Sequence, residues 1–183
     1  ESGIGKTTLI NIILGLIKPS IGAIEVNGVS IYENIEDWQK QIGYVPQDTF
    51  LTDDTIRKNI AFAIPDNEID DEAVKKAIKD SKLEKFVQNL EHNFNTKVGE
   101  FGDRISGGQR QRIAIARSLY NNPKILIFDE FTNFLDSTTE KEIINEVNAL
   151  KGKKTIIMIT HRLSTLEKCD KVYEIDKHGI KIH

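Results

Sequence analysis

Four short apolar runs constrain the fold of this chain more than any other feature of its sequence. They lie at residues 42–45, 125–128, 155–159 and 172–175. Their apolar residues are continuous rather than alternating with polar ones, which is typical of strands buried on both faces of a parallel sheet. Helical patterns at 8–16 and 137–150 lie between them, so the sequence predicts an α/β fold. Residues 21–26 predict an additional strand outside this core.

The middle of the chain has a different pattern. From about residue 52 to residue 119 no segment favours a strand, and the apolar residues recur at helical spacing. We therefore expect an all-helical insertion within the α/β core. The predicted division is 1–50 for the first part of the core, 51–119 for the helical subdomain and 120–183 for the rest of the core.

Composition excludes several classes of protein. The chain has 183 residues, enough for one domain, and 39% hydrophobic residues argue against disorder. A single cysteine, Cys169, cannot form an internal disulfide. The net charge of -3, without a basic block, gives no sign of a nucleic-acid partner. Apolar runs stay well short of the roughly 18 residues that a membrane span needs.

A glycine-rich segment near the start of the chain carries the first chemical motif. Gly5, Lys6 and Thr7 fill the last three places of the phosphate-loop pattern G-x-x-x-x-G-K-[ST], whose first glycine would precede the first residue. Such a loop turns backbone N–H groups onto phosphates, while the lysine contacts the β- and γ-phosphates and the hydroxyl binds Mg²⁺. A glycine-rich helix start with an unrelated lysine is the alternative. The residues of the predicted nucleotide site are Ser2, Gly3, Gly5, Lys6, Thr7 and Thr8.

Two acids, Asp129 and Glu130, follow the apolar run 125–128. The carboxyl end of a buried strand is where α/β sheets place ligands. We expect Asp129 to hold Mg²⁺, directly or through water, and Glu130 to polarise an attacking water. An acid at this place also suits the N-terminus of a following helix. The upstream Lys6 is what favours the catalytic interpretation.

A third motif reads Ser-Gly-Gly-Gln from Ser106 to Gln109. Ser106 can cap a helix that begins at the glycines, and a helix start of this kind binds anions. Without the other motifs, a capped turn is the simpler interpretation.

The three motifs together resemble those of ATP-binding cassette (ABC) ATPases, whose signature is Ser-Gly-Gly-Gln after an apolar residue. Further motifs follow in the family's order: Gln47 resembles the Q-loop, 133–136 the D-loop, and His161 the switch histidine. The resemblance covers essentially the whole chain. It implies a P-loop NTPase fold with a mainly parallel sheet and an inserted all-helical subdomain.

The resemblance also implies a mechanism that uses two cassettes, paired head to tail, with each ATP between the phosphate loop of one and the signature of the other. Glu130 would be the general base, His161 would contact the γ-phosphate, and Gln47 would complete the shell of Mg²⁺ and water. The implied catalytic residues are Glu130, His161 and Gln47. The implied metal ligands are Thr7, Gln47 and Asp129. The implied signature contacts to the ATP of the partner cassette are Ser106, Gly107, Gly108 and Gln109.

Three features resemble exporter-type cassettes: the segment 96–100 before the signature, the segment 55–60 after the Q-loop, and Trp38. They imply a transmembrane domain in the same full-length chain and a place on the cytoplasmic face of a membrane. We expect an ATPase that powers an exporter or flippase; the transported substrate is read by a domain that this sequence does not contain.

Two other functions stay open at this point. A soluble ABC ATPase would share the same ATP chemistry, and a degenerate cassette would lack turnover, although Glu130 and His161 are both present. We expect the chain to be truncated at both ends, soluble by itself, and weakly active or inactive in isolation. Phe131 and Phe134 are bulkier than the residues usual around the D-loop of the family.

Overall fold

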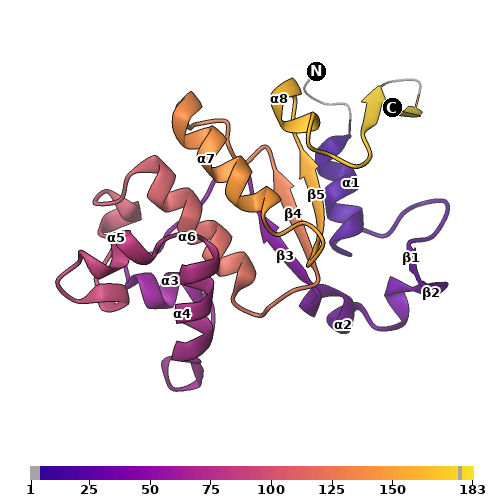
Figure 1. Ribbon diagram of the computed structural model, residues 1–183. Helices are drawn as coiled ribbons and strands as arrows, with labels where there is room; N and C mark the ends of the chain where they lie inside the picture. The colour runs from indigo at the N-terminus through magenta and orange to yellow at the C-terminus, as the bar shows by residue number, and fades with distance from the viewer. Residues whose placement is uncertain (1–4, 177–178) are drawn as a thin grey trace.

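The computed structural model describes residues 5–176 and 179–183, and a three-stranded parallel sheet lies at its centre (Figure 1). Its strands are β3 (Ile42–Val45), β4 (Ile125–Asp129) and β5 (Thr155–Ile159), in the order β3-β4-β5. Val45 pairs with Phe128, and Asp129 pairs with Ile159. The predicted α/β fold with a parallel sheet is confirmed for these three runs.

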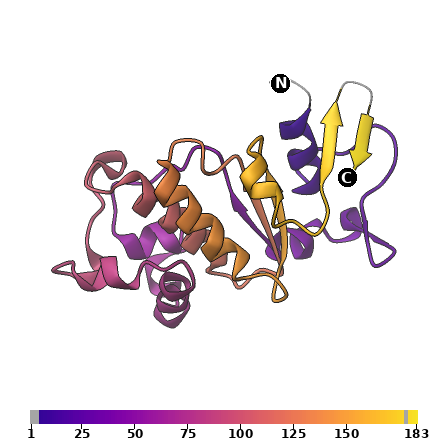
Figure 2. The ribbon, with the colours of Figure 1, turned by 45° about the horizontal axis from the view of Figure 1, so that its top comes forward.

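Helices cover both sides of the sheet. The helices α6 (Gly107–Leu119) and α7 (Ser137–Asn148) lie on one side, and α1 (Lys6–Ile13) lies on the other (Figures 1 and 2). The short α2 (Ile35–Lys40) follows a 3₁₀ turn and leads into β3. The helix α8 (Leu163–Leu166) follows β5.

The remaining helices gather at the end of the molecule away from both termini (Figure 1). They are α3 (Ile56–Ile60), α4 (Asp71–Asp80) and α5 (Glu84–Gln88), with 3₁₀ turns at Asp66–Glu68, Asn93–Asn95 and Glu100–Gly102. The signature helix α6 packs against α3 and α4 as well as against β3. One hydrophobic core therefore continues from the sheet into the helical region. The boundaries of a separate helical subdomain remain a prediction.

The run 172–175 does not join the parallel sheet as predicted. The structure forms β6 (Tyr173–Asp176) there, and this strand pairs antiparallel with β7 (Gly179–Ile182). The run carries a charged residue, Glu174, and both Tyr173 and Glu174 are exposed. Apart from Thr155, the other three runs are buried or half-buried along their length, whereas the first two residues of this strand are exposed.

The strand predicted at 21–26 is shorter than expected. Only β1 (Glu25–Val26) forms, and it pairs with β2 (Val29–Ser30) across Asn27 and Gly28. Both turn residues have positive φ, 53° and 79°, which is the conformation that a two-residue hairpin turn needs. Among the described helices, none is long and apolar enough to cross a membrane.

Gly43 on β3 has no space for a side chain. A Cβ built there would lie 2.3 Å from the carbonyl oxygen of Ser118 and 2.8 Å from Cδ2 of Leu126. We expect Gly43→Ala to lower the free energy of unfolding by about 1–3 kcal/mol, because α6 and β3 must separate to admit a methyl group. Urea unfolding measures this loss. Gly107→Ala is the control, since the nearest atom to its Cβ, on Leu135, is 3.7 Å away; equal losses for both variants would contradict the prediction.

Candidate nucleotide site

The phosphate-loop residues meet the carboxyl end of β4. Gly5 precedes α1 in the left-handed conformation, with φ 95°, which glycine adopts without a steric penalty. The helix therefore begins at Lys6, whose Nζ lies 2.5 Å from Oε1 of Glu130. Thr7 and Thr8 are exposed in the first turn of α1. Ser2 and Gly3 lie outside the described residues.

Glu130 is held at the end of β4 by several contacts. Its N–H donates to the carbonyl of Ile159 at 2.9 Å, and its φ of 42° turns the chain sharply out of the sheet. Oε2 accepts from the side-chain amide of Asn133 at 2.9 Å. The hydrogen bond from Lys6 lowers the pKa of Glu130. The carboxylate is therefore ionised at neutral pH, as a general base requires.

His161 approaches the same carboxylate from the loop after β5. Its Nδ1 lies 3.9 Å from Oε1 of Glu130, and its side chain is 59% exposed. Lys6, Glu130 and His161 thus converge on one point from three distant segments. Gln47 is exposed in the loop after β3. Because Val45 pairs with Phe128 in parallel register, Gln47 and Glu130 follow their strands at the same edge of the sheet.

Asp129 has a neighbour that the sequence does not indicate. The hydroxyl of Tyr44 donates to Oδ2 of Asp129 at 3.4 Å. Burial raises the pKa of Asp129, and burial together with the nearby carboxylate raises the pKa of Tyr44 to about 12. The carboxylate of Asp129 and the hydroxyl of Thr7 are hard oxygen donors of the kind that Mg²⁺ prefers. The residues present therefore fit a magnesium ion.

The signature forms a second surface. Ser106 accepts from the N–H of Gln109 at 3.3 Å, and the Gln109 side chain accepts from the N–H of Ser106 at 3.0 Å, which makes a capping box at the start of α6. This helix start opens into a hollow of about 490 Å³. The hollow is lined by signature residues together with Phe134, Leu135 and Asp136. Among the described residues that line it, none belongs to the phosphate loop.

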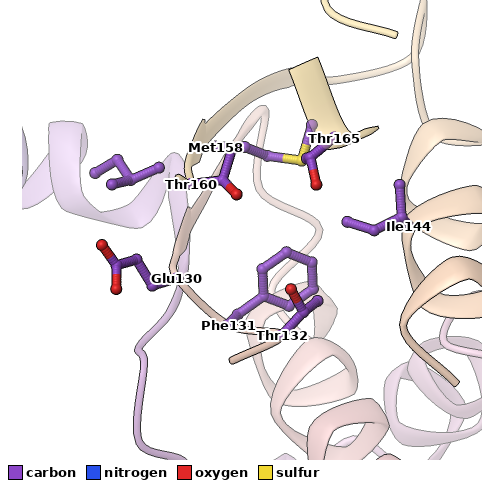
Figure 3. A pocket seen from close by; sticks show the side chains of 8 residues that line it. Glu130, Phe131, Thr132, Ile144, Met158, Thr160 and Thr165 are labelled. Carbon is purple, nitrogen blue, oxygen red and sulfur yellow. The ribbon is translucent and has the colours of Figure 1, made fainter. Parts of the chain in front are cut away.

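The two phenylalanines around the D-loop have different environments. Phe131 is 4% exposed, and its ring centroid lies 4.6 Å from that of Phe128. In Figure 3 its ring lies among Met158, Ile144 and Thr165, and the Glu130 carboxylate points away from it. Phe134, in contrast, is 75% exposed beside the signature. Phe131 therefore belongs to the core.

Sequence reasoning missed the roles of Tyr44 and Asn133. The sequence predicts Tyr44 to be a buried residue of a strand, and it indicates Asn133 only as one residue of the D-loop motif. One indication for Tyr44 is available in the sequence. A tyrosine hydroxyl on one strand can reach the carboxylate at the end of the neighbouring strand, which here is Asp129. The register of the two strands, which puts Tyr44 opposite Ile127, is needed to see it.

Comparison with known proteins assigns the family. The sequence profile of the ABC transporter family matches residues 1–133. The chain is 40% identical over 180 residues to an ATP-dependent lipid A-core flippase of Ralstonia nicotianae, covering 97% of this chain and 30% of that protein. It is also 40% identical over 180 residues to a multidrug resistance ABC transporter ATP-binding and permease protein of Lactococcus lactis subsp. cremoris, covering 98% and 30%.

The fold agrees with this match. A solved structure of a bacterial Atm1-family ABC exporter with ATP bound superposes with a TM-score of 0.83 and 37% identity, over 96% of this chain and 31% of the other. The chain thus spans about a third of the length of these relatives. The chain belongs to the ABC transporter family, and its fold is that of the family's ATP-binding domain.

Proposed function

We propose that this chain binds and hydrolyses ATP as the nucleotide-binding domain of an exporter-type ABC transporter or flippase. The observation that carries the proposal is the convergence of Lys6, Glu130 and His161 on one point at the edge of the sheet. Two relatives that match nearly the whole chain are named an ATP-dependent lipid A-core flippase and a multidrug resistance ABC transporter ATP-binding and permease protein, which supports transport over a soluble ABC ATPase.

The contacts around Glu130 suggest how the reaction starts. Lys6 donates a hydrogen bond to one carboxylate oxygen, and the side chain of Asn133 donates to the other. When the Lys6 ammonium turns to the β- and γ-phosphates of ATP, Oε1 becomes free to accept a proton from the attacking water. His161 lies on the same side of Glu130 and would donate to the γ-phosphate. Catalysis then rests on positioning and charge, as in other phosphoryl transfers to water.

Mg²⁺ would be held by Thr7, Asp129 and Gln47. When bound, it neutralises phosphate charge. Tyr44 keeps one oxygen of Asp129 oriented by its hydrogen bond. This bond also favours the ionised form of Asp129 and so opposes the effect of burial on its pKa.

A complete ATP site would need a second cassette in head-to-tail arrangement. The signature residues Ser106, Gly107 and Gly108 open into a separate hollow, away from Lys6. A phosphate there would face the amide groups at the start of α6 and the positive end of its dipole. The transmembrane domain would belong to the same full-length protein and would place this chain on the cytoplasmic face of the membrane.

The test uses the full-length protein that carries this chain, reconstituted in vesicles. We expect saturable hydrolysis of Mg-ATP, and we expect Gly107→Asp to lower kcat at least about 10-fold while ATP binding changes little, since the new charge repels a phosphate at the signature only. Gly107→Ala, which adds no charge, should lose less. Absence of hydrolysis by the wild-type protein, or equal losses for both variants, would refute the proposal.

A further inference from the structure

A carboxylate outside the motifs described above is buried close to the site. Glu140, in the first turn of α7, is 8% exposed. Its Oε2 forms an ion pair with Nη1 of Arg162, and its Oε1 accepts from the hydroxyl of Thr132 at 3.3 Å. One side chain of α7 thus contacts two separate loops, the one that follows Glu130 and the one that contains His161.

Arg162 adds a second connection between these loops. The Arg162 side chain donates through Nη2 to the backbone carbonyl of Asn133 at 3.5 Å. The backbone N–H of Arg162 donates to the hydroxyl of Thr160 at 3.0 Å. The amide of Asn133 in turn donates to Glu130. A continuous path of polar contacts therefore runs from Arg162, the neighbour of His161 in sequence, to the carboxylate of Glu130.

We propose that Glu140 and Arg162 form a positioning pair that keeps His161 in register with Glu130 during ATP hydrolysis; the inference rests on the proposed function. The side chain of His161 is largely exposed, so packing does little to fix its loop. The ion pair joins Arg162, the residue after His161, to α7. The buried side chains of α7 are part of the hydrophobic core. Neither Glu140 nor Arg162 touches a reacting atom in this arrangement, so both act through His161, Glu130 and Asn133.

A second ion pair on the same helix offers a matched comparison. Arg112 Nη2 lies 2.9 Å from Oε1 of Glu146, which is six residues beyond Glu140 on α7. The side chains of Glu140 and Glu146 are 10% and 21% exposed, so both are largely buried. The Glu146 pair joins α6 to α7, and within the described residues neither Glu146 nor Arg112 forms a hydrogen bond with the loops of Glu130 and His161. If Glu140 had only a structural role, Glu140→Gln and Glu146→Gln would change kcat by similar amounts.

The experiment measures ATP hydrolysis by the full-length protein as wild type, Glu140→Gln, Arg162→Gln, the double variant, and Glu146→Gln. We expect each of the first two to lower kcat about 10-fold, since a displacement on the order of 1 Å at a catalytic group costs up to about 100-fold. KM for ATP should change less than about 2-fold, because Lys6 is untouched. The double variant should be no slower than the slower single variant, as for residues acting as a unit. Glu146→Gln should keep the wild-type kcat.

Three outcomes would overturn the proposal: an unchanged kcat in Glu140→Gln, losses that multiply in the double variant, or an equal loss of kcat in Glu146→Gln. Thermal unfolding of every variant accompanies the kinetics. If a glutamine variant does not fold, Glu140→Asp and Arg162→Lys replace it. The expected result is again a lowered kcat with little change in KM for ATP. A wild-type protein without ATPase activity contradicts the proposed function itself, whereas an active wild type with an active Glu140→Gln contradicts only the positioning pair.

Discussion

Glu130→Gln should lower steady-state ATP hydrolysis by about 10²–10⁴-fold, the usual contribution of a general base. The amide keeps the size of the side chain and its place at the end of β4, but it cannot take a proton from water. ATP binding should persist, because Lys6, freed from its ion pair with Glu130, remains available for the phosphates. With ATP uncleaved, the closed pair of cassettes should accumulate.

Turnover in the full-length protein and cross-linking of the two cassettes in Mg-ATP measure this effect. Glu146→Gln is the control, since it makes the same substitution at an ion pair between two helices. Preserved steady-state hydrolysis in Glu130→Gln would remove Glu130 from its assigned role as the base.

Lys6→Ala is expected to weaken ATP binding about 10- to 100-fold. A hydrogen bond to a charged group contributes about 1.5–3 kcal/mol, and alanine removes both the charge and the donor at the β- and γ-phosphates. Isothermal titration calorimetry measures the affinity directly. Lys18→Ala is the matched control, because Lys18 is exposed and lies over the Tyr32 ring, away from the site. An unchanged affinity in Lys6→Ala would contradict the phosphate-loop assignment.

The same substitution should change the response of the chain to acid. The hydrogen bond from Lys6 is the largest cause of the lowered pKa of Glu130, whose ordinary value is 4.5. A carboxylate with a lowered pKa stabilises the folded state above its unfolded pKa, and this contribution is lost as the pH falls through the folded value. In Lys6→Ala the pKa of Glu130 should rise, so the stability difference from wild type should be present at neutral pH and vanish in acid.

Much of the fold follows from local patterns. The runs 42–45, 125–128 and 155–159 are continuously apolar because both faces of the sheet are covered, and all three form strands of one parallel sheet. The helix predicted at 137–150 forms as Ser137–Asn148, with Asp136 accepting from the N–H groups of Thr138 and Thr139. The run 172–175, which contains the charged and exposed Glu174, pairs with β7 instead, since pairing depends on partners that a short run does not specify.

Local patterns in the sequence predict the chemistry proposed for the site. Lys6 beside Thr7, Asp129 beside Glu130, and Ser106 three residues before Gln109 are local arrangements, and helix starts and strand ends act on neighbours in the chain. The chemistry of these motifs can therefore be predicted without knowing the tertiary fold.

Which of these groups are in contact depends on the tertiary structure. Lys6 and Glu130 are 124 residues apart in sequence and 2.5 Å apart in space. The contact of Tyr44 with Asp129, and that of Glu140 with Arg162, depend on strand register and on the docking of α7 beside the sheet. No local pattern encodes such contacts, because each is fixed by the packing of whole elements around a shared core, and a shift of one residue in register would undo it.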